Sequence, residues 1–167
     1  MRHAAASLVI LISFQVISAE PIPRAQLEAT AIRAAKRHHI PPDLLLAVCL
    51  VESHWRSNAV GDDGRSIGVC QIQINTALHL YGDGWLPERS REERRAMMMK
   101  ILKNPEQNIN LAARLLRRYL TRFHEDETLA ILAYNGGPEN ALIRYVNKVR
   151  RARLHYLPNP TLQGKRP

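Results

Sequence analysis

Residues 44–55 read LLLAVCLVESHW, and this stretch decides the fold. Every residue from Leu44 to Val51 is apolar, so a helix formed here has no polar face and belongs in the core of the domain. Glu52 comes next, three residues after Cys49, and its carboxyl therefore shares one face of that helix with apolar side chains. Such a carboxylate needs a physical reason, because burying a charge is costly.

The helix alone leaves two interpretations of Glu52 open. Partial burial disfavours the ionised carboxyl and raises its pKa, and a raised pKa is what a general acid needs near neutral pH. Alternatively, the side chain reaches water at the end of the helix or pairs with a cation such as Arg56. Only sequence features elsewhere in the chain can distinguish these two interpretations of Glu52.

The rest of the chain has mainly helical periodicity. Asn104 and Asp126 suit the N-cap positions of two helices, and the alternation of Ile72 and Ile74 suits a short strand or turn. These patterns predict a single, mainly α domain. Besides the core helix, which begins at Pro41 and Pro42, helices are expected over residues 26–38, 90–102, 104–120, 128–135 and 138–154, and from about residue 76.

Both ends of the chain are expected to lie outside this domain. Basic residues precede an apolar run and then two small residues, the pattern of a secretory signal peptide over residues 1–19. A membrane anchor is the alternative, but the run is shorter than the roughly 20 apolar residues that a span needs. We therefore expect an exported protein without an integral membrane span, a domain over 20–157 and a flexible tail over 158–167.

Composition limits the partners of the protein. The net charge of +9 favours anionic envelope polymers, acidic lipid surfaces or nucleic acid, but aromatic residues make up only 5% and no nucleic-acid motif is present. We therefore expect no nucleic acid partner. The seven histidines form no ligand-like cluster, so no metal or cofactor is expected. Cys49 and Cys70 form a disulfide in an oxidising compartment or remain two buried thiols.

A second stretch, AILAYNGGPENA over residues 130–141, also carries polar chemistry. Tyr134 and Asn135 lie at the end of an apolar helix and before two glycines, so their polar groups emerge where the backbone can bend. A tyrosine hydroxyl can donate to a carboxyl group, and an asparagine amide can bind a sugar hydroxyl or acetamido group. The alternative for Tyr134 is a core aromatic whose hydroxyl is satisfied locally.

Four sequence blocks together resemble the lytic transglycosylase domain of the soluble (SLT) type. They are VES at 51–53, SIGVCQIQINTA at 66–77, NINLAARLL at 108–116 and ILAYNGGPENA at 131–141, in the order of the family. The resemblance implies a lysozyme-like fold of the goose type, with a short β or turn segment in the glycan groove. It also implies that peptidoglycan glycan strands are the substrate.

The resemblance assigns roles residue by residue. Glu52 matches the catalytic acid/base and Asn108 matches a residue whose role we take to be mainly structural. Where the family often has methionine this chain has Cys70, the change that a disulfide to Cys49 would require. The residues that match substrate-binding or orienting positions are Ser53, Gly68, Gln71, Tyr134 and Asn135.

In the reaction that the resemblance implies, one glutamate acts as acid and then as base. The muramyl C6 hydroxyl attacks C1, which gives a 1,6-anhydro sugar. A hydrolase of the same fold is one alternative, with Asp62 or Asp63 as the second carboxylate unless both are turn formers. The other is a non-catalytic glycan-binding module. The small size resembles the specialised transglycosylases of secretion and conjugation systems, whose components are then the expected partners in the periplasm or cell envelope.

Overall fold

The computed structural model describes residues 22–82, 86–136 and 139–157. The predicted signal peptide over residues 1–19 and the predicted tail over 158–167 lie outside the described residues, as does Pro138, where the last helix was expected to begin. Within the described ranges, no helix is long and apolar enough to cross a membrane.

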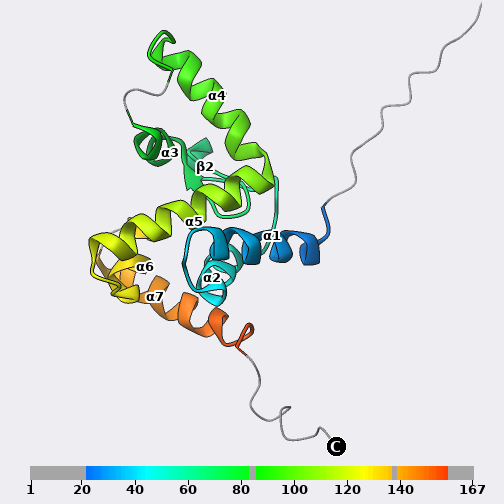
Figure 1. Cartoon of the computed structure of the whole chain (residues 1–167), viewed down its shortest axis with the longest axis vertical. Helices are drawn as coiled ribbons and strands as arrows, with labels where there is room; N and C mark the ends of the chain where they lie inside the picture. Colours follow the sequence, from blue (N-terminus) through cyan, green and yellow to red (C-terminus); the bar gives the residue numbers. More distant parts are fainter. Residues whose placement is uncertain (1–21, 83–85, 137–138, 158–167) are drawn as a thin grey trace, which may run out of the picture.

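Seven α-helices make up most of the described chain (Figure 1), which confirms the mainly α prediction. α5 crosses the middle of the molecule and contacts α1, α2, α4 and α6, while α2 packs against α7. The helices are α1 (Arg24–Arg37), α2 (Pro42–Ser53), α3 (Ile74–Tyr81), α4 (Arg91–Lys103), α5 (Pro105–Arg122), α6 (Glu127–Asn135) and α7 (Glu139–Arg153).

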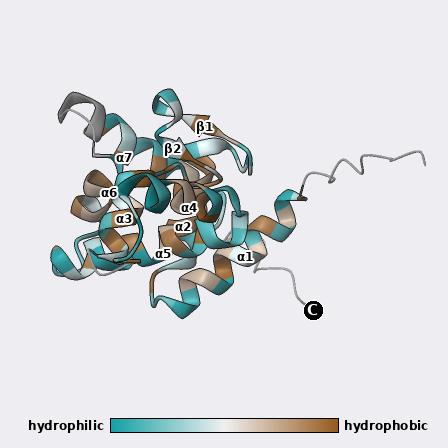
Figure 2. Cartoon of the chain, turned by 90° about the horizontal axis from the view of Figure 1, so that it is seen from above, coloured by the Kyte–Doolittle hydropathy of each residue, from teal (hydrophilic) through white to brown (hydrophobic). Residues whose placement is uncertain are grey.

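The apolar helix predicted from residues 44–55 is α2, and it is the core of the domain. Every side chain from Leu44 to Cys49 is buried, and all but Leu46 are completely buried. Buried apolar residues of the surrounding helices form one core cluster with those of α2. The alternation of teal and brown along α1 in Figure 2 shows that this surrounding helix carries both hydrophilic and hydrophobic residues. The core helix thus fixes the position of Glu52, near its C-terminal end, relative to the rest of the domain.

Three helices begin where side-chain chemistry favours a helix N-terminus. The Asn104 side chain accepts a hydrogen bond from the Gln107 amide, and that of Asp126 accepts one from Leu129, so both predicted caps are confirmed. Ser90 and Glu93 form a capping box at the start of α4. These bonds satisfy backbone amides that the helices themselves leave unpaired.

A small antiparallel sheet follows α2. Its last strand includes Ile72, where the sequence predicted a short strand or turn, whereas Ile74 begins α3. The strands are β1 (Val60–Gly61), β2 (Ser66–Ile67) and β3 (Ile72–Gln73), in the order β1-β2-β3. Ile67 pairs with both Val60 and Ile72. A single 3-10 turn, η1 (Asp62–Gly64), joins the first two strands.

Candidate active site

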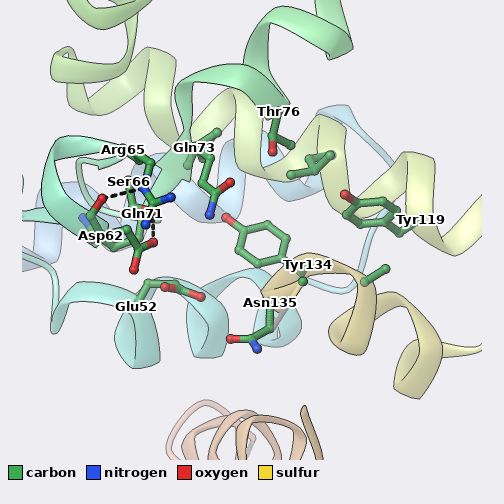
Figure 3. Close-up of a pocket in the computed structure, with 14 residues that line it drawn as sticks. Glu52, Asp62, Arg65, Ser66, Gln71, Gln73, Thr76, Tyr119, Tyr134 and Asn135 are labelled. Carbon is green, nitrogen blue, oxygen red and sulfur yellow. Dashed lines mark hydrogen bonds between the residues drawn. The ribbon is translucent and has the colours of Figure 1, made fainter. Parts of the chain in front are cut away.

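A polar hollow of about 540 Å³ lies between the sheet, the end of α2 and the end of α6 (Figure 3). Glu52 faces it from α2, Tyr134 and Asn135 from α6, and Gln71 from the loop between β2 and β3. The remaining lining residues are Asp62, Arg65, Ser66, Ile72, Gln73, Thr76, Leu115, Tyr119, Ala133 and Gly136.

Glu52 is partly buried and hydrogen-bonded in this hollow. Oε1 of Glu52 accepts a hydrogen bond of 2.5 Å from the hydroxyl of Tyr145 on α7. Burial raises the pKa of Glu52 to about 7; the Tyr145 bond opposes this rise and the nearby Asp62 charge adds to it. Arg56, the possible ion-pair partner in the sequence, donates to the Ser53 carbonyl instead. At neutral pH a large share of Glu52 therefore carries a proton.

Asp62 and Asp63 have different surroundings. Asp62 lines the hollow, and its carboxylate accepts a hydrogen bond from the Ser66 hydroxyl. Both aspartates are exposed, but Asp63 is not among the lining residues. Of the two aspartates, only Asp62 shares a hollow with Glu52.

Residues 67–70, which we name the groove loop, are fixed to three helices. From α2, the buried Ser53 hydroxyl donates to the Val69 carbonyl at 2.6 Å. The predicted disulfide is present and joins Cys49 of the same helix to Cys70. From α6, the Tyr134 hydroxyl donates to the Cys70 carbonyl at 2.7 Å.

Asn108 attaches the groove loop to the third helix, α5. Its buried side chain accepts from the Cys70 amide at 2.9 Å and donates to the Ile67 carbonyl at 2.8 Å and the Leu102 carbonyl at 3.1 Å. A buried amide with all of these bonds satisfied is rigidly held. The geometry agrees with the structural role that we expected for Asn108.

Gly68 is required by the close approach of the groove loop to α5. Its φ is +79°, in the left-handed region, and a Cβ there would lie 2.5 Å from Asn108 Nδ2 and 2.8 Å from the Leu102 carbonyl oxygen. Gly68 is buried and is not among the residues that line the hollow. Its contribution to the site is the shape of the loop.

Gln71 is the residue of the Gly-x-x-Gln element that reaches the hollow. Its Nε2 donates to the carbonyls of Ala59, at 3.2 Å, and Gly68, at 3.0 Å. The two carbonyls belong to residues next to β1 and β2, so these bonds fix the orientation of the Gln71 amide relative to the small sheet. Gln71 thus lines the hollow with a side chain that the loop backbone holds in place.

Sequence reasoning missed Tyr145 as a partner of Glu52. We expected Tyr134 to orient Glu52, but the Tyr134 hydroxyl binds the Cys70 carbonyl and the hydroxyl on Glu52 is that of Tyr145. Tyr134 thus binds the groove loop through its hydroxyl and does not contact Glu52 by a hydrogen bond. No motif marks Tyr145; its only signal in the sequence is helical spacing with the apolar Val149 and Ala152, with which it shares the buried face of α7.

A second, smaller hollow adjoins the far end of the first. Tyr119 and Thr76 lie there, away from Glu52 (Figure 3), and the smaller hollow, of about 130 Å³, shares Thr76, Leu115 and Tyr119 with the first. On the near side, the Asn135 amide has no hydrogen-bond partner among the described residues.

The described ranges contain no cluster of three or more His, Cys, Asp or Glu side chains that could hold a metal ion.

Comparisons with known proteins show which family and fold the chain resembles. A family model described as the transglycosylase SLT domain matches residues 29–154. Among solved structures, the chain is similar to the lytic transglycosylase Slt from Pseudomonas aeruginosa, an inactive mutant in which a glutamate is replaced by glutamine. The TM-score is 0.60 at 22% identity, over 83% of this chain and 25% of that one, so this chain spans about a quarter of that structure. A comparison with curated protein sequences gives no match.

Proposed function

The chain belongs to the transglycosylase SLT domain family, and on that premise we propose that it is a peptidoglycan lytic transglycosylase. The bond cleaved is the β-1,4 bond between N-acetylmuramic acid and N-acetylglucosamine. The observation that carries the proposal is Glu52 in a polar hollow with its pKa raised to about 7. The inactive glutamate-to-glutamine mutant of the Pseudomonas protein supports a glutamate as the working group in this family.

In the proposed reaction, Glu52 first acts as the acid. Its proton goes to the glycosidic oxygen while the bond from that oxygen to the muramyl C1 breaks. Glu52 then acts as the base and takes the proton of the muramyl C6 hydroxyl, whose oxygen bonds to C1. The products are a 1,6-anhydromuramyl end and a free N-acetylglucosamine 4-hydroxyl, and no water is consumed. Glu52 regains its proton, which suits a carboxyl with a pKa near neutrality.

The neighbouring residues take positioning and binding roles in this proposal. Tyr145 fixes the orientation of the Glu52 carboxyl through its hydrogen bond. The amide of Asn135, which is unpaired among the described residues, binds a sugar hydroxyl or acetamido group at the edge of the hollow. Ser53, Gly68 and Tyr134 act through the groove loop, and Gln71, which directly follows that loop, presents its side chain to the glycan.

A hydrolase is the second candidate, and Asp62 is the observation that favours it. Its carboxylate lines the same hollow as Glu52 and is the second carboxylate that activation of a water molecule would require. Mass analysis of digested peptidoglycan separates the two, because anhydro products weigh one water less than hydrolytic ones. For a transglycosylase we expect anhydro products from both the wild type and Asp62→Asn. Hydrated products that disappear in Asp62→Asn would establish the hydrolase.

The cellular role is the part of the proposal that rests on the sequence resemblance. We propose that the protein is exported and opens the cell wall locally while a secretion or conjugation machine is assembled. The Cys49–Cys70 disulfide supports an oxidising compartment such as the periplasm. A non-catalytic glycan-binding module is the alternative, and it predicts that purified protein binds sacculi without releasing soluble fragments.

A further inference from the structure

A second large hollow, of about 580 Å³, lies against the other side of α2 from Glu52 and combines an apolar floor with a basic rim. The floor is made by Leu50, Val51 and Ala152. The rim is made by five basic or histidine side chains: Arg24, His54, Lys148, Arg151 and His155. We name these eight residues the basic hollow; none of them is acidic.

Two of the three cations of the basic hollow are unpaired. Among the described residues, the side chains of Lys148 and Arg151 have no hydrogen-bond or ion-pair partner, and neither have the rings of His54 and His155. Arg24 binds Glu28, but Glu28 does not line the hollow. Like charges gathered in one place repel one another, so an anionic ligand would remove an unfavourable interaction as well as gain favourable ones.

Helix stabilisation does not account for this cluster. Lys148 and Arg151 lie three residues apart on one face near the end of α7, where cations interact favourably with the helix dipole, and His155 follows that helix. Arg24, however, begins α1, and His54 follows the end of α2. Side chains from three separate helices thus converge on one concavity whose volume is typical of ligand sites.

We propose that the basic hollow binds an acidic segment of a partner protein that carries apolar side chains among its carboxylates. The apolar side chains occupy the floor, and the carboxylates pair with Lys148 and Arg151 on the rim. A polypeptide suits this concavity better than a membrane, because a flat lipid surface does not reach its floor. The proposal needs no cleavage of glycan, so it stands or falls independently of the proposed function.

Fluorescence anisotropy of the full chain with a short labelled peptide of glutamate and leucine tests the proposal. We expect Lys148→Ser/Arg151→Ser to weaken binding at least about tenfold, since two charged contacts are lost. The conservative Lys148→Arg should retain binding. The matched control is Arg91→Ser/Lys103→Ser on α4, which removes the same charge from exposed positions and should change the affinity less than about twofold.

Peptide and lipid controls decide the remaining outcomes. A peptide with glutamine in place of glutamate, or serine in place of leucine, should bind more weakly than the parent peptide if both rim and floor are used. Equal weakening by the two double variants would show attraction to net charge alone and overturn the proposal. The proposal is also overturned if the peptide does not bind. It is overturned as well if the protein binds phosphatidylglycerol vesicles instead of the peptide and this vesicle binding is lost in Lys148→Ser/Arg151→Ser.

Discussion

The hydroxyl of Tyr145 on α7 donates a 2.5 Å hydrogen bond to Oε1 of Glu52 on α2, although 93 residues separate them in the sequence. Burial raises the pKa of Glu52, and this bond lowers it. The protonation of Glu52 is therefore set by two helices that pack against each other only in the folded domain.

Removing the Tyr145 hydroxyl should change the pH dependence of cleavage. The bond favours the ionised carboxyl, so Tyr145→Phe should raise the pKa of Glu52 further. Because the reaction begins with protonated Glu52, the activity of the wild type should fall as pH rises through about 7. In Tyr145→Phe this falling limb should move to higher pH by up to about one pH unit, while kcat decreases because the carboxyl is less well oriented.

Tyr134→Phe is the control for this pH profile. Its hydroxyl binds the Cys70 carbonyl, so its loss should reduce activity through the groove loop without raising the pKa of Glu52. If the falling limb of the pH profile of Tyr145→Phe stayed in place or moved to lower pH, the Tyr145 hydrogen bond would not lower the pKa of Glu52.

Glu52→Gln should be more stable than the wild type at high pH. The pKa of Glu52 is about 7 in the folded protein against an ordinary value of 4.5, so the folded state binds the proton more tightly than the unfolded state. The wild type therefore loses stability as pH rises from 4.5 to about 7. We expect the variant to gain up to ~3 kcal/mol in unfolding free energy above this window and almost nothing below it.

Urea denaturation of both proteins below and above the window measures this difference. Glu88→Gln, at an exposed position, should show no such pH-dependent gain. If the difference in unfolding free energy between Glu52→Gln and the wild type is the same below and above the window, Glu52 is not desolvated in the folded protein.

Two glycines should differ sharply when replaced by alanine. Gly68→Ala forces a Cβ to 2.5 Å from Asn108 Nδ2, whereas Gly64→Ala, with a φ of +84°, meets nothing within 4 Å. Positive φ costs a non-glycine residue about 1–2 kcal/mol at either position, and the clash adds about 1–3 kcal/mol at Gly68. Chemical denaturation should show the larger loss in Gly68→Ala; equal losses would mean that the groove loop does not lie against Asn108.

The disulfide should contribute strongly to stability. Cys49 and Cys70 are 21 residues apart, and closing a loop of this length stabilises a fold by ~3 kcal/mol in the chain-entropy model. Cys49→Ala/Cys70→Ala should lose about that amount and also activity, because the groove loop loses its covalent attachment to α2. A wild type whose unfolding midpoint is the same with and without reductant would contradict this expectation.

The sequence predicts much of the fold because its strongest signals are local. The apolar run of α2 has no polar face, and side chains at Asn104 and Asp126 cap the helices that follow them directly. The two-residue strands of the sheet carry too little periodicity to be assigned individually, and their pairing depends on turns with positive φ such as those at Asp62 and Asp63.

The candidate site is less predictable because its contacts join distant segments. Glu52 could be singled out from its position on an apolar helix, but Tyr145 lies outside the four family-like blocks. Ser53 adjoins Glu52 in sequence and nevertheless turns into the core, where it binds the Val69 carbonyl. A helix places consecutive side chains about 100° apart, so one faces the hollow and the next the interior.

The most direct test of the central claim, that Glu52 is the acid and base, is the release of fragments from purified peptidoglycan by Glu52→Gln. Glutamine keeps the size of the side chain and removes the proton that the reaction needs. We predict that the wild type releases 1,6-anhydromuramyl fragments, and that Glu52→Gln remains folded and binds sacculi but releases none above the background without enzyme. Fragment release by Glu52→Gln at the rate of the wild type would contradict the account.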